Sequence, residues 1–304
     1  MPLAIQAERA AKISLCVTSV VVVVKLLAGW ATGSVSVLAE ATQSLVDVLI
    51  AFGVVQSVRF SARPPDEDHP YGHGRAEVLM SAFQMVLIMG SAGFIVSQAI
   101  ARLKHPEPIQ VDWGLAAMSF AAIANFIVSR YLLAVSKKTG STALLGEVQH
   151  LQGDTLSSLG VLLGLILVRL TGIQQLDPIC AIALMVLVVF LAIKQLRVIV
   201  HQLMDGALPP EEREILVNTL QSHPNVKGFH AIRSRTVGSN RYIDLHVLLD
   251  DNLTFVEAHD LAEEIEGELG NALGQATVSV HFEPFMHEIE HRKKAHGDLP
   301  VIKP

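Results

Sequence analysis

The amino-acid sequence predicts a helical membrane domain followed by a small soluble α+β domain. Three observations support this: an apolar composition, its uneven distribution, and a change of pattern near residue 205. Of the 304 residues, 51% are hydrophobic and 17% are charged, and the mean hydropathy of +0.44 is too high for an ordinary soluble chain. Because the apolar excess lies almost wholly before residue 204, we expect domains at 1–204 and 205–286. A polar, histidine-containing tail at 287–304 is expected to be disordered.

Six apolar stretches are long enough to cross a membrane as helices. About 20 apolar residues span the hydrocarbon core, and such stretches lie at roughly 13–31, 36–60, 78–101, 113–135, 144–170 and 177–200. Turn-forming residues separate them, for example Gly33-Ser34 and Asp177-Pro178. The first stretch has no convincing cleavage site and is too long for a signal-peptide core, so we expect it to be retained. An even number of crossings places both termini on one side.

Basic residues near the helix ends predict the orientation. On the side of the termini lie Arg9, Lys12, Arg59, Arg63, Arg75, Lys137, Lys138, Lys194 and Arg197, against Arg102, Lys104 and Arg169 on the other side. Since basic residues concentrate in cytoplasmic loops, both termini are expected in the cytoplasm. Lys25 is an exception deep in the first stretch, where it can snorkel or pair with an acid.

Charge and cysteine content narrow the classes of partner. The net charge is −6, and no run of Lys and Arg is long enough for a phosphate-binding face, so no nucleic acid is expected. Cys16 and Cys180 lie in apolar stretches and are expected to pack as small hydrophobic residues. The sequence therefore implies no disulfide framework.

The chain after residue 205 has the pattern of a soluble domain. A helix is expected from Pro209-Pro210 to about Ser222, and another at 254–269. Segments 228–235, 241–249 and 276–282 alternate polar and apolar residues as strands do. The order helix, strand, strand, helix, strand predicts one three-stranded sheet covered by helices.

Polar side chains interrupt two of the apolar stretches in matching pairs. Gln43 and Asp47 lie four residues apart in the second stretch, and His150 and Asp154 lie four apart in the fifth. This spacing brings two helical side chains to one face, so each pair can reach one ion. A charge at membrane depth costs roughly 2.5–3.5 kcal/mol, and imidazole and carboxylate groups suit zinc and similar divalent ions. The pairs predict a metal site, with hydrogen bonding between helices as the alternative.

A second candidate metal site lies in the loop after the second stretch. Asp66, His69 and His73 fall within eight positions, and Gly72 and Gly74 give the backbone freedom to wrap one ion. Solvated loop histidines are the alternative interpretation.

A third group of metal-ligating residue types lies in the soluble domain. It comprises His230 and His246 on neighbouring predicted strands, His259 on the helix, and His281 and Glu283 on the last strand. Residues two apart on a strand share a face, so His281 and Glu283 point the same way. Whether all five converge is a hypothesis, and incidental histidines are the alternative.

Together these features resemble the cation diffusion facilitators, and most closely the bacterial zinc and iron transporters of that family. The resemblance rests on the six stretches, the Asp of the second, the His-x-x-x-Asp of the fifth, the soluble domain, and the loop Asp-x-x-His-Pro-Tyr-Gly-His-Gly-Arg-x-Glu, and it covers residues from about 10 to 286. It implies a homodimer in the lipid of the bacterial inner membrane that exports divalent metal in exchange for protons and is not an enzyme. Its cytoplasmic domain would fold like a metallochaperone. Zinc, ferrous iron, cobalt, cadmium and manganese all accept such ligands.

The resemblance also implies roles for individual residues. The transport ligands would be Asp47, His150 and Asp154 with Gln43; the loop site Asp66, His69 and His73; the two-metal cytoplasmic site His230, His246, His259, His281 and Glu283; and a charge lock Arg75 with Asp205. An Arg–Asp pair can form bidentate contacts.

Two departures from the family pattern bear on function. Gln43 stands where relatives carry an aspartate or histidine, so the site loses a titratable group, which predicts fewer protons per ion or an altered ion preference. Glu40, seven residues before Asp47 on the same helical face, is a candidate to supply the missing carboxylate. Glu283 replaces an aspartate and lengthens the reach by one methylene group, and we expect that site to survive.

Two rival functions remain at the level of sequence. The first is a metal sensor or scaffold that keeps the fold but no longer transports. Gln43 permits this function, because it replaces a ligand of the transport site. A membrane metalloenzyme is disfavoured, because no His-Glu-x-x-His motif accompanies the ligands.

Overall fold

The computed structural model describes residues 2–32, 35–104, 113–173, 175–274 and 276–287. The chain forms two compact units, Met1–Val200 and His201–Pro304, each of which is considered by itself. The expected turn at Gly33-Ser34 and the expected disordered tail beyond residue 287 lie outside the described residues.

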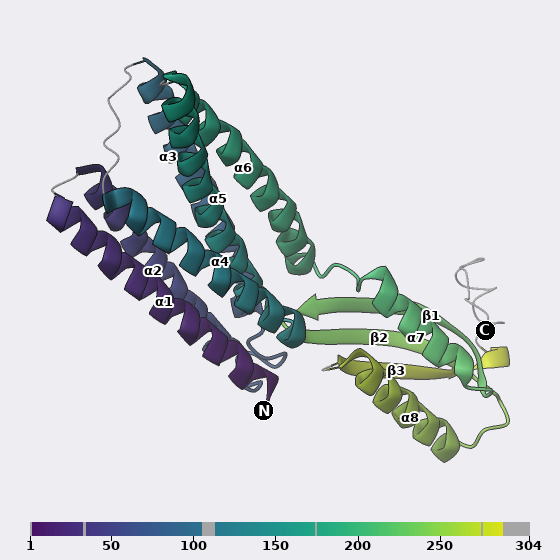
Figure 1. The fold of residues 1–304 in the computed structure, drawn as a ribbon. Coiled ribbons are helices and arrows are strands. Elements are labelled where there is room, and N and C mark those ends of the chain that lie inside the picture. The colour runs from purple at the N-terminus through teal and green to yellow at the C-terminus, as the bar shows by residue number, and fades with distance from the viewer. Residues whose placement is uncertain (1, 33–34, 105–112, 174, 275, 288–304) are drawn as a thin grey trace. The chain divides into compact units, whose positions relative to one another are not determined.

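Six long helices account for the apolar part of the chain (Figure 1). They are α1 (Leu3–Thr32), α2 (Val35–Ser61), α3 (Arg75–Lys104), α4 (Trp113–Thr139), α5 (Thr142–Thr171) and α6 (Leu176–Leu203). Each predicted apolar stretch lies inside one of them. The largest difference is at the start of α1, which begins ten residues before the predicted stretch. This extension is amphipathic: Glu8 lies 2.7 Å from both Lys12 and Arg59, while Ala7 is buried.

Five helices of the described chain are long and apolar enough to cross a membrane. These segments are Leu3–Leu27, Ser44–Ser61, Arg75–Lys104, Ser119–Thr139 and Pro178–Leu203. Helix α5 has 30 residues and packs against α3 and α4. Large apolar side chains such as Leu49 and Phe190 are exposed, as expected for helices whose outer surface faces lipid.

Small side chains allow close packing in the helical unit. Ala7, Ala10 and Ala11 of α1 lie in one buried cluster with Val54 of α2 and Leu144 of α5. Without a strong hydrophobic driving force in lipid, helices associate through such close van der Waals contact. This packing brings α1, α2 and α5 together.

The soluble unit is a three-stranded sheet with two helices (Figure 1). Its elements are α7 (Pro210–Ser222), β1 (Val226–Val237), β2 (Asn240–Leu249), α8 (Phe255–Leu273) and β3 (Ala276–Pro284). The sheet order is β1-β2-β3, with β1 and β2 antiparallel and β2 and β3 parallel. Because parallel strands need a crossover connection, α8 joins β2 to β3. The predicted order of elements and the predicted fold class are both confirmed.

A shared hydrophobic core holds the helices of this unit on the sheet. Leu220 of α7 and Leu269 of α8 pack with Phe229, Ile243 and Val247 of the strands. Helix α8 begins with a capping box, in which the Thr254 side chain accepts from Glu257 N and the Glu257 side chain accepts from Thr254 N. The cap defines the start of α8 one residue after the predicted position.

Candidate metal centres

The first candidate centre joins α2 to α5 inside the helical unit. His150 Nε2 lies 3.1 Å from Asp47 Oδ1 and 3.9 Å from Asp154 Oδ2, one turn further along α5. One ligand atom from each residue lies within 4.8 Å of the others. His150 is 6% exposed, and the two aspartates are partly buried. One imidazole and two carboxylates form a set of three protein ligands that suits a divalent ion with an open fourth position.

Gln43 and Glu40 belong to α2, but their side chains lie outside the part of the chain that the structure describes. Their participation in this centre therefore stays a prediction. The neighbouring Ser44 is described, and its Oγ accepts a hydrogen bond from Lys25 Nζ at 3.0 Å. Lys25 is 9% exposed and interacts electrostatically with Asp154. It therefore stays inside the helical unit instead of snorkelling outward.

A buried acid beside this centre was missed at the level of sequence. Glu147 lies three residues before His150 and is 1% exposed. Its carboxylate accepts hydrogen bonds from Ser14 Oγ of α1 and from Gln84 Nε2 of α3, each at 2.9 Å. The spacing of 147, 150 and 154 places three polar residues on one face of α5, and that spacing could have revealed it.

A second buried acid, Glu77 of α3, caps the beginning of α5. Its carboxylate accepts from Ser141 Oγ and from the backbone N–H of Ala143 at 3.3 Å. The first amides of a helix lack partners within the helix and favour a negative charge. Glu77 therefore has a structural role in positioning α5 against α3.

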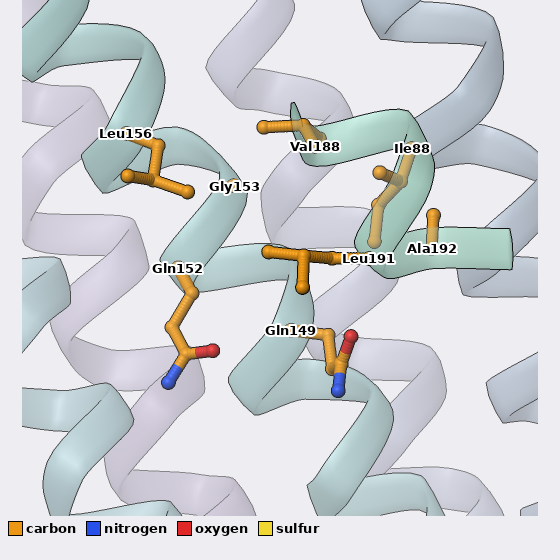
Figure 2. A pocket seen from close by; sticks show the side chains of 8 residues that line it. All are labelled: Ile88, Gln149, Gln152, Gly153, Leu156, Val188, Leu191 and Ala192. Atoms are coloured by element: carbon orange, nitrogen blue, oxygen red, sulfur yellow. The ribbon is translucent and has the colours of Figure 1, made fainter. Parts of the chain in front are cut away.

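A small pocket lies beside the turns of α5 that carry His150 and Asp154 (Figure 2). Its lining comprises Ile88 of α3, Gln149, Gln152, Gly153 and Leu156 of α5, and Val188, Leu191 and Ala192 of α6. Its size suits about one water molecule. Gln149 also donates to Gln195 of α6 at 3.4 Å. Helix α5 therefore presents polar groups to several neighbouring helices at the level of His150.

The second candidate centre is the loop between α2 and α3. Asp66 Oδ1 accepts from the backbone N–H of His69 at 2.7 Å, and Asp66 Oδ2 lies 3.2 Å from His73 Nε2. Gly72 has a φ of +78° and donates to the carbonyl oxygen of His69 at 2.9 Å, which closes the turn. The His73 ring packs against Phe60 at 4.6 Å. The structure thus brings together all three predicted residues.

The charged form of the Asp66 carboxyl group, which is the form that binds a cation, is favoured in this loop. The hydrogen bond from the His69 backbone N–H is the main cause that holds the pKa of Asp66 below its usual value, and the two neighbouring histidines act in the same direction. Asp66 is exposed, so an ion could reach it from solvent.

The third candidate centre follows from the register of the sheet. His230 pairs with His246 across β1 and β2, and His246 pairs with His281 across β2 and β3. The three histidines therefore form one row on adjacent strands. Glu283 reaches this row, with its oxygens 2.9 Å from His230 Nε2, 2.7 Å from His246 Nδ1 and 3.5 Å from His281 Nε2.

The carboxylate of Glu283 is held in its charged form. Burial alone would raise the pKa of Glu283, but the hydrogen bonds from His246 and His230 outweigh burial and lower it. A charged acid bridging a row of imidazoles is an arrangement that can bind one or two divalent ions.

His259 is the predicted member that the structure does not bring into this centre. Its Nε2 lies 3.4 Å from Glu263 Oε1, one turn along α8, and both side chains are exposed. The helical i, i+4 spacing makes Glu263 its nearest partner. Four of the five predicted residues of the group converge.

Arg75 and Asp205 belong to different units of the structure. Within the soluble unit, Asp205 Oδ2 lies 3.5 Å from Arg235 Nη1. A charge lock between Arg75 and Asp205 stays a prediction.

A helical membrane unit with a carboxylate and imidazole cluster inside it defines a class of protein, the membrane cation transporters. The comparison with family models agrees with this class. Residues 11–204 match the cation efflux transmembrane domain, and residues 208–285 match the cation efflux protein cytoplasmic domain. The chain therefore belongs to the cation efflux family and is a multi-pass membrane protein, which confirms the resemblance inferred from its motifs.

Individual relatives cover nearly the whole chain. The cation-efflux pump FieF of Serratia proteamaculans (strain 568) is 34% identical over 278 residues, which are 91% of this chain and 92% of the relative. FieF of Yersinia pestis (strain Pestoides F) is 33% identical over 293 residues, 96% of this chain and 97% of the relative. Among solved structures, the metal-bound C-terminal domain of the CzcD transporter from Thermotoga maritima is 27% identical and covers 24% of this chain and 87% of its own, with a TM-score of 0.24.

Proposed function

We propose that this chain exports divalent metal ions across the bacterial inner membrane in exchange for protons. The observation that carries the proposal is the cluster of Asp47, His150 and Asp154 on two long helices of the segment that matches the cation efflux transmembrane domain. Such groups are costly in a membrane and are rarely present there without a function. The similarity to cation-efflux pumps over more than nine tenths of the chain supports export as that function.

Proton exchange follows from the chemistry of the ligands. Imidazole and carboxylate bind metal only when deprotonated, so metal entry releases protons and protonation expels the metal. Transport needs the cluster to open alternately to the two sides of the membrane. The termini lie in the cytoplasm in this proposal. Gln43 adds a neutral oxygen ligand, so it lowers the number of titratable groups at the site.

The two outer centres have supporting roles in this proposal. Asp66, His69 and His73 bind one ion near the membrane surface. The row of His230, His246 and His281 with Glu283 binds metal in the cytoplasm and ties two copies of the chain into a homodimer; His259 joins it after leaving Glu263. Arg75 and Asp205 form a charge lock close to the membrane. Zinc is the ion that the ligand chemistry favours, and ferrous iron, cobalt, cadmium and manganese are further candidates.

The decisive test of this function is metal flux in proteoliposomes loaded with a metal-sensitive dye. We expect Asp154→Ala to abolish zinc flux, because it removes one of the described ligands. Glu264→Ala, which removes an exposed acid of α8 outside all three centres, serves as the control and should transport like the wild type. Unchanged flux in Asp154→Ala would remove the transport role from this cluster.

The contribution of Glu40 has its own test. If Glu40 compensates for Gln43, Glu40→Gln lowers zinc affinity and changes the order in which competing divalent ions inhibit flux. An unaltered affinity and order would show that Glu40 takes no part.

A second candidate function is a metal sensor or scaffold that binds metal without transporting it. Gln43 favours it, because a site with one acid fewer binds a cation less strongly. Measuring flux alongside a metal-dependent conformational change of the cytoplasmic domain separates the two functions. A sensor would show the conformational change and no flux.

A further inference from the structure

We propose that Glu147 is a proton-carrying residue of the transport cycle, an inference that rests on the proposed exchange of metal for protons. Glu147 is not one of the metal ligands. Its carboxyl group gives up a proton when a metal ion enters the cluster from the cytoplasm. The group takes up another after the ion has left on the opposite side.

The position of Glu147 is fixed by three helices. It belongs to α5, and it accepts from Ser14 of α1 and from Gln84 of α3 through separate oxygens, Oε1 and Oε2, each at 2.9 Å. A Cβ at the neighbouring Gly146 would collide with the Gln84 amide. Glycine at this position therefore lets the Gln84 side chain pass close to α5 and reach Glu147.

The hydrogen-bond partners of Glu147 suit both of its protonation states. When the carboxylate is charged, it accepts from Ser14 Oγ and Gln84 Nε2. Gln84 Oε1 is buried and has no hydrogen-bond partner among the described residues, although buried acceptors are normally paired. A turn of the Gln84 amide group exchanges its nitrogen and oxygen, so that a protonated Oε2 of Glu147 donates to Gln84 Oε1 while Glu147 Oε1 still accepts from Ser14 Oγ. The Gln84 amide can thus support Glu147 before and after proton release.

Charged groups surround Glu147 on the side of the metal cluster. Electrostatic interactions link it to His150, Asp47 and Asp154. Lys25 of α1 acts on the same Asp154. The other charged groups with described side chains on neighbouring helices are Glu8, Arg9 and Lys12 of α1, Arg59 of α2, Arg75, Glu77, Arg102 and Lys104 of α3, Arg130, Lys137 and Lys138 of α4, and Lys194 and Arg197 of α6. Apart from the buried Glu77, which caps α5, and the half-buried Glu8, these groups are exposed. Within the described part of the chain, the hydrogen bonds to the Glu147 carboxylate come from neutral donors, Ser14 and Gln84.

Charge balance explains why the cluster needs such an acid. Asp47, Asp154 and Lys25 together carry one negative charge, and a bound divalent ion turns this into one positive charge. A net charge away from water is unfavourable, and a charged Glu147 brings the metal-bound cluster to neutrality. After the ion leaves and a ligand takes up a proton, the cluster itself is close to neutral, and a charged Glu147 would be left without a balancing charge. Protonation of Glu147 in the metal-free state removes this unbalanced charge.

Glu77 provides a matched comparison in the same protein. Both acids are buried on the α3–α5 interface, being 4% and 1% exposed. Glu77 accepts from Ser141 Oγ and from a backbone amide at the start of α5, and its electrostatic partners do not include the residues of the metal cluster, so its protonation state is not expected to follow metal binding. The proposal therefore assigns proton transfer to Glu147 alone.

Proton release on zinc binding tests this assignment. The full-length protein in detergent is mixed with Zn²⁺ in weak buffer, and protons released are counted with a pH indicator. We expect Glu147→Gln, which keeps hydrogen-bonding atoms at this position, to release about one proton fewer per transport site than the wild type. Glu147→Asp restores an acid and should restore the count. Glu77→Gln, as the control, should lower stability without changing the count.

The outcomes separate this inference from the proposed function. Equal proton counts for the wild type and Glu147→Gln would overturn the role of Glu147 while leaving metal–proton exchange intact. A wild-type zinc flux that does not respond to a pH gradient in proteoliposomes would overturn both. A lowered count in Glu147→Gln, restored in Glu147→Asp and unchanged in Glu77→Gln, supports the proposal.

Discussion

The helical cluster and the cytoplasmic cluster use the same side-chain chemistry on two different frameworks. Asp47 comes from α2, and His150 and Asp154 come from α5; the side-chain contact between Asp47 and His150 joins the two helices. In the soluble unit, His230, His246 and His281 lie opposite one another on hydrogen-bonded strands. The backbone register thus fixes one cluster, while helix packing fixes the other.

This difference indicates different uses of a metal ion. A sheet cannot shift its register by small steps, because a slip of one residue turns every side chain to the other face. Packed helices can move by 1–2 Å and so change the distances between ligands, as helix shifts of that size do in switching proteins. The cytoplasmic framework therefore suits lasting binding, and the helical framework suits binding followed by release.

The largest expected effect comes from removing one histidine in each cluster. His150→Ala should lower zinc flux at least about 100-fold, since even residues that only support metal ligands typically contribute 10–100-fold. His246→Ala should retain measurable flux while losing zinc bound to the cytoplasmic domain. Flux in proteoliposomes and zinc content per chain are the two measurements. Equal loss of flux in both variants would show that the two clusters do not divide into one for transport and one for lasting metal binding.

A smaller effect is expected from disturbing helix packing without touching a ligand. Gly146→Ala should displace the Gln84 amide from Glu147 and lower stability by about 1–3 kcal/mol, the range for a buried polar group that loses its partner. Gly267→Ala is the control, because a Cβ there meets nothing within 4 Å and should stabilise α8 by about 0.5–1 kcal/mol. Thermal unfolding in detergent measures both. A Gly146→Ala protein as stable as the wild type would contradict the packing argument.

The smallest effect concerns acid pH and the cytoplasmic cluster. The pKa of Glu283 is lowered in the folded protein from its usual value of 4.5. Its charged form therefore contributes stability above pH 4.5, and this contribution is lost as the pH falls through the lowered folded value. Relative to Glu283→Gln, the metal-free wild type should lose stability as the pH falls below 4.5, the usual pKa, and through the lowered folded pKa. Parallel unfolding curves for the two proteins over this range would contradict the assigned charge.

Much of the fold was predictable because its signals are local. Length and hydropathy located all six long helices, and the alternation of polar and apolar residues located the three strands. The strand pairings that align His230, His246 and His281 depend on contacts between distant residues. The sequence suggested that the histidines share a domain, but only the register shows that they form a row.

Site residues were predictable where they lie one helical turn apart or within one short loop. Asp47, His150 and Asp154 converge as expected, and so do Asp66, His69 and His73. Glu147 was missed because its partners, Ser14 and Gln84, lie on two other helices. The interaction of His259 with Glu263 was also missed, although the two residues are four apart on a predicted helix.

The most direct test of the account is zinc accumulation in proteoliposomes that carry an imposed pH gradient. Exchange of metal for protons at Asp47, His150 and Asp154 predicts that zinc accumulates on the acidic side above its concentration on the other side. It also predicts that a proton ionophore abolishes the accumulation, and that Asp47→Asn does not accumulate zinc. Accumulation that persists after the pH gradient has been collapsed would contradict the central claim.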